Sequence, residues 1–290
     1  MVIVKLWGGL GNQLFQYAFG QYLSSRLNTD VKYDIQTTNN IDHFTQREFG
    51  FPLLNIDIMV ASAVEINSMR LTKIRLFGRL ERKISQIVPF IFRHYFVEPV
   101  NSKSPDTIRF KDNCYYDGYW QSYKYLSYNE NRLHNEIRLL SITPAIYDKL
   151  NSIRSTFSIS IHVRRGDYIT VKANADIFHT CSLAYYQQAI EYIRTRYVSA
   201  QFFVFSDDLN WVKENLEGNQ LVLMEGNVPA VDLFLMSNCK HNIIANSSFS
   251  WWGGWLNQNI EKIVICPRDW YKGELNNTTV DLIPPQWIRI

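Results

Sequence analysis

The second half of the chain alternates between two hydrophobic periods. Short runs rich in β-branched and aromatic residues, with the length of strands, occupy residues 158–163, 201–205, 221–224, 241–245 and 262–266. Apolar positions at helical spacing lie between them, at residues 183–197, 209–216 and 230–237, and another helix is expected to open after residue 246. Strands that alternate with helices over such short distances indicate a parallel, doubly wound α/β sheet.

The N-terminus shows the same order of elements. Residues 1–6 are predicted to form a strand, residues 7–13 a glycine-rich turn, and residues 31–34 a second strand. A helix is expected between the two strands, because apolar residues recur at spacings of three and four: Phe15, Ala18, Phe19, Tyr22 and Leu23. Asn12 is its predicted N-cap. A glycine turn that leads into a helix presents backbone N–H groups to an anion, although these glycines lack the dinucleotide-binding spacing.

Residues 35–130 have weaker patterns. Basic residues interleaved with apolar ones fill residues 70–93, with Glu81 as the one acid among them. A basic amphipathic helix is typical of a segment that contacts an anionic membrane surface, and a solvated helix packed on its own domain is the alternative. Residues 114–128 are dense in aromatic side chains and include Asp117 and Gln121. This stretch is expected either to border a sugar site or to form the edge of a core.

Length and composition allow two globular domains. The 290 residues are expected to divide into an N-terminal α/β domain (1–150) and a C-terminal Rossmann-like domain (151–290). A net charge of +3 is too small to indicate a nucleic-acid-binding protein. The four cysteines lie far apart, which indicates neither a zinc site nor a disulfide framework. With no secretory signal pattern and no apolar run long enough to span a bilayer, a cytoplasmic protein is expected.

Three polar turns follow predicted strands in the second half, at residues 162–167, 206–208 and 246–250. Because the carboxyl ends of parallel strands lie on one edge of a sheet, these turns are expected to converge. Arg164 and Arg165 supply positive charge for a diphosphate. Ser247 and Ser248, with the N–H groups of the helix that begins there, supply neutral donors.

Asp207 and Asp208 add carboxylates to the same edge. Either carboxylate can accept hydrogen bonds from N1 and N2 of guanine. Capping of the following helix is the alternative, and one of the two is expected to cap it. The Ser-Asp-Asp order is not the D-x-D motif of metal-dependent glycosyltransferases, so no divalent metal site is expected. Trp251, Trp252 and Trp255 are expected to anchor the next helix in the core.

Three stretches together carry a resemblance to a known family. HVRRGDY at 162–168, GGLGNQLFQYAFG at 8–20 and NSSFSWWGGWLN at 246–257 resemble the motifs of the α-1,2-fucosyltransferases of glycosyltransferase family 11, and the resemblance covers nearly the whole chain. It implies a GT-B-like α/β fold, in which two Rossmann-like domains face each other across a cleft. It also implies GDP-β-L-fucose as the donor, bound mainly by the C-terminal domain, with inversion at the anomeric carbon and a terminal galactose as acceptor.

The resemblance implies roles for residues of these motifs. Arg164 is expected to contact the β-phosphate of the leaving GDP, His162 the nucleotide, and Asp208 the guanine base. The other donor-binding residues are Gly11, Asn12 and Gln13 from the N-terminal domain, the phosphate-binding turn of Ser247, Ser248 and Phe249, and, from the residue patterns, Arg165 and Asp207. Asp167 is the candidate general base for the acceptor hydroxyl, with a structural salt bridge to one of the arginines as the alternative.

We therefore expect an inverting galactoside α-1,2-fucosyltransferase that acts on galactose-terminated glycans or on lipid-linked oligosaccharides of the O-antigen type. It is expected to need no metal ion and no nucleic acid, and to be cytoplasmic, with segment 70–93 as its contact with the inner face of a membrane. A family member that uses another nucleotide sugar is the first alternative. A non-catalytic glycan-binding protein is the second, and its expected sign is loss of Arg164 and Arg165, both of which are present.

Overall fold

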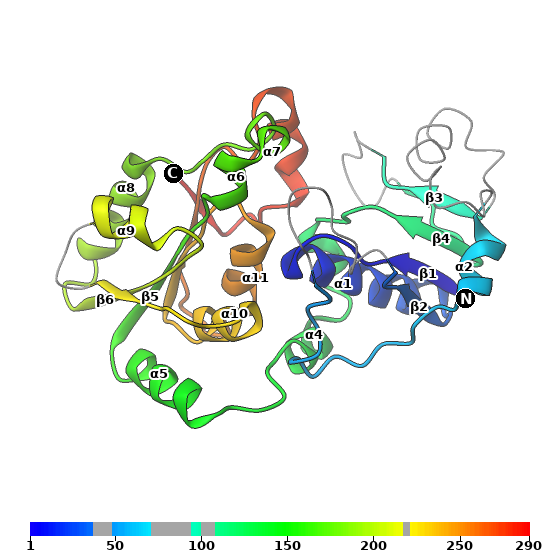
Figure 1. Ribbon diagram of the computed structural model, residues 1–290, viewed down its shortest axis with the longest axis horizontal. Helices are drawn as coiled ribbons and strands as arrows, with labels where there is room; N and C mark the ends of the chain where they lie inside the picture. The colour runs from blue at the N-terminus through cyan, green and yellow to red at the C-terminus, as the bar shows by residue number, and fades with distance from the viewer. Residues whose placement is uncertain (37–47, 71–93, 100–107, 217–220) are drawn as a thin grey trace. The chain divides into compact units, whose positions relative to one another are not determined.

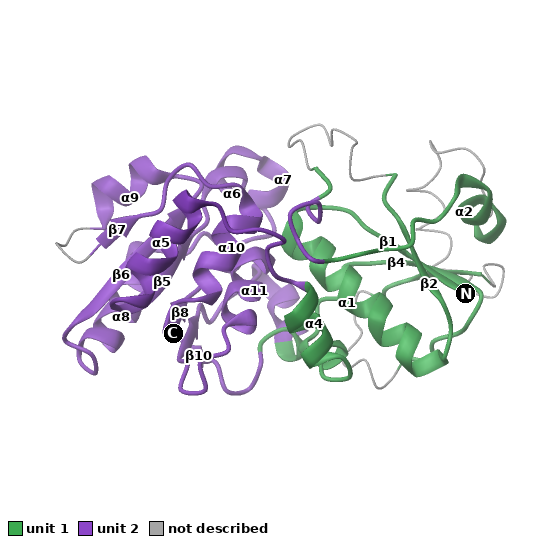
Figure 2. Cartoon of the chain, turned by 90° about the horizontal axis from the view of Figure 1, so that it is seen from below, with its two compact units in different colours: residues 1–49, 56–136, 280–283 green, residues 50–55, 137–279, 284–290 purple. Residues whose placement is uncertain are grey.

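The computed structural model describes residues 1–36, 48–70, 94–99, 108–216 and 221–290. The chain forms two compact units (Figure 2): unit 1 comprises residues 1–49, 56–136 and 280–283, and unit 2 comprises residues 50–55, 137–279 and 284–290. Apart from residues 50–55, unit 2 therefore begins after Glu136, whereas the boundary predicted from the sequence lies after residue 150. The reason is helix α5 (Pro144–Arg154), which packs against β5 and α10 of unit 2; Arg154 donates to Asn238, the residue that ends α10, at 2.9 Å.

Unit 1 contains a parallel sheet with the strand order β2-β1-β4-β3 (Figure 1). The strands are β1 (Val2–Lys5), β2 (Val31–Asp34), β3 (Tyr95–Val97) and β4 (Cys114–Asp117). The helical segments are α1 (Leu10–Leu27), α2 (Ala63–Met69), the 3-10 turn η3 (Tyr123–Tyr125) and α4 (Glu130–Glu136). The strands predicted at residues 1–6 and 31–34 are thus confirmed.

Helix α1 organises the core of unit 1. Phe19 stacks on the buried Trp120, with ring centroids 4.0 Å apart and planes 6° from parallel. Gly20 allows the helix to approach β2, because a Cβ at this position would collide with the hydroxyl of Tyr33. The helix begins at Leu10 with Gly9 as N-cap, so the prediction of Asn12 as N-cap is wrong. The extended backbone of Gly9 lets its carbonyl accept from the N–H of Asn12 at 2.9 Å, inside the first turn.

Unit 2 is built on a six-stranded parallel sheet with the order β10-β9-β8-β5-β6-β7. The strands are β5 (Phe157–Val163), β6 (Ala200–Ser206), β7 (Leu221–Leu223), β8 (His241–Ile243), β9 (Val264–Cys266) and β10 (Ile288–Arg289). The helices after α5 are α6 (Gly166–Thr170), α7 (Lys172–Ala175), α8 (Leu183–Arg194), α9 (Leu209–Asn215), α10 (Pro229–Ser237), α11 (Ser248–Leu256) and the 3-10 helix η4 (Gly273–Asp281). The parallel, doubly wound sheet predicted for this half is confirmed. Helices α6 and α7 lie between the predicted strand 158–163 and the predicted helix 183–197, where no helix was predicted, and both are too short to show an apolar period.

Side chains along β5 alternate between the two faces of this sheet. Ile159, Ile161 and Val163 pack in a buried cluster with apolar residues of α8 and α9. The residues between them belong to the other face, where Ser160 accepts from Asn242 and the His162 ring lies near Phe249 of α11. The alternation therefore places His162 on the side of the sheet that carries the N-terminus of α11.

Other expectations concern burial and membrane contact. Trp251 and Trp252 are fully buried, as expected for residues that anchor α11 in the core, whereas Trp255 is half-buried and contacts both of their rings. All four cysteines are buried and free. The basic segment 70–93 lies, apart from Arg70, outside the described residues, and the membrane contact proposed for it stays a prediction. Within the described parts of the chain, no helix is both long and apolar enough to cross a membrane.

The contact between α1 and β2 gives a stability prediction. We expect Gly20→Ala to lower the melting temperature, because overpacking a tight contact costs about 1–3 kcal/mol and outweighs the gain of about 1 kcal/mol in helix propensity. Gly253→Ala in α11 is the matched control, since the three atoms nearest to its Cβ all belong to the Met236 side chain, at 3.2 Å or more, against 2.3 Å for the Tyr33 hydroxyl at Gly20. Thermal unfolding of the purified variants decides, and a melting temperature for Gly20→Ala at or above that of Gly253→Ala would contradict the packing argument.

Candidate functional site

The ends of three neighbouring strands bring the predicted polar turns together. β5 pairs with β6 on one side and with β8 on the other, and Val163 lies opposite Ser206 in the register. The turns that follow these strands carry Arg164 and Arg165, Asp207 and Asp208, and Asn246 to Ser248. The prediction that these turns converge at the carboxyl edge of a parallel sheet is confirmed by the contacts between them.

Arg164 is held between two carboxylates. Its Nη2 lies 2.6 Å from Oδ1 of Asp167, and its Nη1 lies 2.9 Å from Oδ2 of Asp207. The guanidinium carbon also lies 5.8 Å from the centroid of the Tyr168 ring. With 21% of its side chain exposed, Arg164 is a fixed cation that still reaches the surface. The salt bridge to an arginine, which was the alternative to a catalytic role for Asp167, is present. The role of Asp167 as a general base stays a prediction.

Arg165 is fixed by a second set of contacts. Its Nε lies 3.3 Å from Oδ2 of Asp208, and its guanidinium carbon lies 4.3 Å from the centroid of Trp211. Asp208 is also the N-cap of α9, since its Oδ1 accepts from the N–H of Trp211 at 3.1 Å. The expectation that one of the two aspartates caps this helix is therefore confirmed, and the capping residue is Asp208.

Asp207 links the two arginines through a close approach to the backbone. Its Oδ1 accepts from the N–H of Arg165 at 2.9 Å, while Oδ2 pairs with Arg164. Gly166 makes this approach possible, because a Cβ there would lie 2.7 Å from Oδ2 of Asp207. The glycine of the HVRRGDY motif is thus required by the packing of a carboxylate, and not by an unusual backbone angle.

His162 is buried beside these charges. Only 5% of the residue is exposed, and its ring centroid lies 5.4 Å from that of Phe249. Burial, with a smaller contribution from the charge of Arg164, lowers the pKa of His162 to about 3, so the imidazole is neutral near pH 7. Its Nδ1 has no hydrogen-bond partner among the described residues. A buried polar atom of this kind is uncommon and marks a position where a ligand can supply the missing partner.

The turn before α11 is pinned by Asn246. Its Nδ2 donates to the carbonyls of His179 at 2.6 Å and Trp270 at 2.9 Å, and its backbone carbonyl accepts from the Tyr168 hydroxyl at 2.9 Å. Ser247 is the N-cap of α11, and Ser248 and Phe249 form its first turn. The N-terminus of α11, with its backbone N–H groups, therefore lies next to His162 in a fixed position.

Sequence reasoning missed several residues that hold this edge in place. Tyr168, Trp211 and Asn246 contact the arginines or the turn before α11, yet no role was expected for them. Tyr168 and Asn246 lie inside the motifs quoted above, which was the available signal. For Trp211 the signal was weak, because an aromatic residue in a short helix is typical of a core.

The three predicted site residues of unit 1 have structural contacts of their own. Gln13 is buried, and its Nε2 donates to the carbonyls of Gly8 at 2.8 Å and Glu48 at 2.9 Å. Asn12 accepts from Gln121 at 2.8 Å, and Gly11 lies beside it in the first turn of α1. These contacts shape the glycine-rich turn. The expected contact of Gly11, Asn12 and Gln13 with a diphosphate or a fucose stays a prediction.

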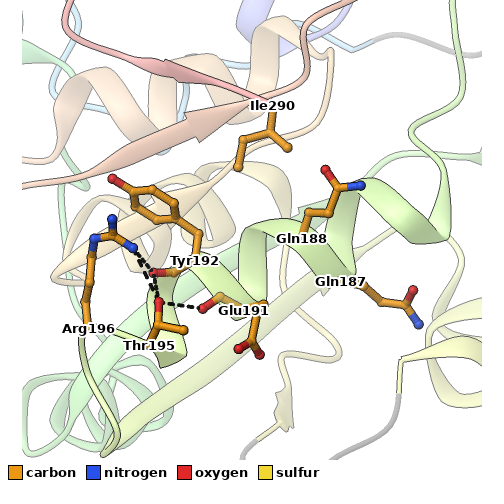
Figure 3. Close-up of a pocket in the computed structure, with 7 residues that line it drawn as sticks. All are labelled: Gln187, Gln188, Glu191, Tyr192, Thr195, Arg196 and Ile290. Carbon is orange, nitrogen blue, oxygen red and sulfur yellow. Dashed lines mark hydrogen bonds between the residues drawn. The ribbon is translucent and has the colours of Figure 1, made fainter.

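A surface depression elsewhere in unit 2 shares no residue with this edge. It has a volume of about 550 Å³, opens widely to solvent on the outer side of α8, and is lined by Gln187, Gln188, Glu191, Tyr192, Thr195, Arg196 and Ile290 (Figure 3). Within the described parts of the chain, no group of three or more His, Cys, Asp and Glu side chains is placed to hold a metal ion.

The chain is similar to known glycosyltransferases. The family model for glycosyl transferase family 11 matches residues 1–290. An α-1,2-colitosyltransferase of Escherichia coli is 33% identical over 100% of this chain and 99% of its own length. The O-antigen biosynthesis glycosyltransferase WbnK of Escherichia coli is 32% identical over 98% of this chain and 99% of its length, and galactoside α-(1,2)-fucosyltransferase 2 of Sus scrofa is 30% identical over 47% of this chain and 43% of its length.

A solved structure shares the fold. The fucosyltransferase NodZ from Bradyrhizobium matches with a TM-score of 0.53 and 14% identity, over 87% of this chain and 91% of that chain. At this level of identity the likeness concerns the fold alone, and it agrees with the α/β units and their parallel sheets. The expected GT-B-like α/β fold class is therefore confirmed.

The buried imidazole gives a pH prediction. In the unfolded chain His162 binds a proton below about pH 6.5, whereas in the folded protein it does so only near pH 3. The unfolded state therefore binds more protons between these values, so stability is lost as the pH falls, by up to about 1.4 kcal/mol per pH unit. We expect the free energy of unfolding, measured with urea from pH 6.5 to 5, to fall less steeply in His162→Gln. The contributions of other groups, such as His241, are the same in both proteins and cancel in the comparison. Equal slopes of unfolding free energy against pH in the wild type and His162→Gln would contradict the burial of a neutral imidazole.

Proposed function

The chain belongs to glycosyltransferase family 11, and on this premise we propose that it transfers L-fucose from GDP-β-L-fucose to the 2-hydroxyl of a terminal β-galactose, with inversion at the anomeric carbon. The observation that carries the proposal is the guanidinium of Arg164, oriented by Asp167 and Asp207 at the carboxyl edge of the unit 2 sheet. This edge also holds Arg165, the buried His162 and the N-terminus of α11. Such a set of donors suits the diphosphate of a nucleotide sugar.

Arg164 acts on the leaving group in this proposal. As the bond between fucose and the β-phosphate breaks, negative charge grows on the phosphate oxygens. A guanidinium that is already oriented, by carboxylates at 2.6 and 2.9 Å, stabilises this charge without having to reorganise in the transition state. The two carboxylates also offset the positive charge of Arg164 and hold its guanidinium in one orientation.

His162 and the first turn of α11 bind the nucleotide in this proposal. The neutral imidazole acts as a hydrogen-bond partner rather than a charge, because its pKa is held near 3 by burial. Ser247, Ser248 and Phe249 present the helix N-terminus to the phosphates. The guanidinium of Arg165, which contacts Asp208 and Trp211, gives the second positive charge.

Asp208 is the proposed reader of guanine. Its oxygens accept from the N–H of Trp211 and pair with Arg165, but a carboxylate has about four lone-pair positions, which leaves room for the N1 and N2 hydrogens of the base. Asp167 is the candidate general base; it pairs with Arg164 and also accepts from Asn174 at 3.4 Å. The alternative is a mechanism without a dedicated base. Transfer without a divalent metal ion remains part of the proposal, with the arginines neutralising the diphosphate.

A second donor is favoured by one specific similarity. The α-1,2-colitosyltransferase matches the full length of this chain at 33% identity. Colitose is L-fucose without its 3-hydroxyl, so the same leaving group and the same attack geometry apply. The relative named for O-antigen biosynthesis supports a lipid-linked oligosaccharide as the natural acceptor.

Product analysis tests the function directly. We expect the purified protein to transfer fucose from GDP-fucose to β-galactosides in the presence of EDTA, and proton NMR of the product to show an α-fucoside on the 2-hydroxyl. GDP-colitose, offered in competition, measures which donor has the higher kcat/KM. A β-fucoside, substitution at the 3-hydroxyl, or activity that depends on Mg²⁺ or Mn²⁺ would contradict the corresponding part of the proposal.

The oriented guanidinium gives a kinetic prediction. Arg164→Lys keeps the charge but cannot pair with Asp167 and Asp207 through two nitrogens, so we expect kcat to fall by about 10²–10³. The matched control is Arg196→Lys, an arginine of unit 2 whose guanidinium lies over Tyr192, away from the sheet edge. Steady-state kinetics and thermal unfolding of both variants are the measurements, and near-normal kcat in Arg164→Lys would remove this residue from the mechanism.

A further inference from the structure

A second polar edge lies in unit 1. Strands β1 and β4 are parallel neighbours, with Val4 opposite Tyr116, so the turns that follow them lie side by side (Figure 1). The first turn is the glycine-rich stretch from Leu6 to Gly9, and the second runs from Gly118 to Gln121. Both turns contain a residue with positive φ, Gly8 at 79° and Trp120 at 55°. A bulky residue such as Trp120 is strained in this left-handed backbone conformation, which persists only where the surrounding structure holds it.

The two turns carry a pair of stacked aromatic rings. Trp7 and Tyr119 have ring centroids 4.3 Å apart and planes 28° from parallel. Trp120, the next residue, is fully buried against Phe19, while Tyr119 remains 37% exposed. The strained backbone at Trp120 therefore directs two adjacent aromatic side chains to different places: Trp120 into the core and Tyr119 to the surface.

Polar contacts fix the aromatic pair in place. Gln16 bridges the turns, because its Oε1 accepts from the N–H of Trp7 at 2.9 Å and its Nε2 donates to the carbonyl of Gly118 at 3.1 Å. The indole N–H of Trp7 donates to the same carbonyl at 3.3 Å. Glu98 accepts from the N–H groups of Tyr119 at 2.7 Å and Trp120 at 3.0 Å. The exposed ring is thus presented by a rigid framework.

Charged and amide groups border the rings. The Nζ of Lys5 lies 5.2 Å from the centroid of Trp7 and 3.2 Å from Oδ2 of Asp117. Gln121, two residues after Tyr119 in the same turn, donates to Asn12 at 2.8 Å. A wholly apolar partner would desolvate these groups at a cost, whereas a partner with both C–H surface and hydroxyls can satisfy them. A pyranose ring combines these two features.

We propose that the Trp7–Tyr119 pair binds the galactose ring of the acceptor, with the C–H face of the sugar on the exposed ring of Tyr119 and a hydroxyl directed to Gln121 of the same turn. The proposal rests on the function proposed above and assigns its acceptor to residues of unit 1. In this proposal the sugar contacts the flat face of the Tyr119 ring and not its hydroxyl. The pair therefore sets the affinity for the acceptor and takes no part in binding GDP.

Substitution of the exposed ring tests the assignment. We expect Tyr119→Ala to raise the KM for methyl β-D-galactoside by roughly tenfold, with the affinity for GDP, measured by calorimetry, unchanged. Tyr119→Phe keeps the ring and should stay within about twofold of the wild type. Tyr128→Ala is the matched control, because Tyr128 is a more exposed tyrosine of unit 1 (61%) that packs against Tyr22. Tyr119→Leu, which keeps apolar bulk without a ring face, replaces the alanine variant if thermal unfolding shows that the latter does not fold.

The outcomes separate the two proposals. An unchanged KM in Tyr119→Ala and Tyr119→Leu, or an equal rise in Tyr128→Ala, overturns the assignment and leaves the transferase function standing. If the wild type transfers no sugar to β-galactosides, the proposed function fails, and saturation-transfer NMR with methyl β-D-galactoside then tests the aromatic pair alone. Signals that are present in the wild type and in Tyr128→Ala but lost in Tyr119→Ala support the site; no signal in the wild type, or equal signals in all three proteins, overturns it.

Discussion

The ion pairs of Arg164 with Asp167 and Asp207 connect the local sequence to the tertiary fold of unit 2. Asp167 lies in the same turn as Arg164, but Asp207 comes from the next strand of the sheet, so the guanidinium is oriented only when β5 and β6 are in register. The contact then extends outward, since Asp207 also accepts from the backbone of Arg165 across the gap that Gly166 leaves open. One charged network thus depends on strand pairing, and the geometry of the proposed phosphate site depends on that network.

Burial on the two sides of β5 gives this edge its electrostatic character. The apolar face with α8 and α9 anchors the strand, and the opposite face buries His162 next to α11. Desolvation keeps the imidazole neutral, so the positive charge of the edge is concentrated on the two arginines. A neutral hydrogen-bonding group beside fixed cations suits a nucleotide, because it can make a directional hydrogen bond and does not repel the guanidinium groups.

Unit 1 uses the same architecture for a different surface. Its turns also follow neighbouring parallel strands, but they are joined by side-chain amides and by Glu98 rather than by arginine–carboxylate pairs. The result is an aromatic surface with a polar border in place of a cationic edge. Within the proposed function this difference matches the two substrates, since a nucleoside diphosphate needs charge and a galactose ring needs apolar contact together with hydrogen bonds.

Hydrophobic period and turn chemistry are local properties, so the sequence by itself determined the elements that have a clear period, and the residue types of the polar turns. These elements are β1, β2, β5, β6, β7, β8 and β9, and the helices α1, α8, α9, α10 and α11. The sequence also indicated that Arg164, Asp207 and the turn before α11 converge, since parallel strands end on one edge. Only the tertiary structure decided which aspartate caps α9 and which clamps the arginine, because both were equally placed in sequence and the register of β6 separates them. The roles of Trp211 and Asn246, the start of α1 at Leu10 and the exposure of Tyr119 beside the buried Trp120 likewise depend on long-range packing, which no local pattern contains.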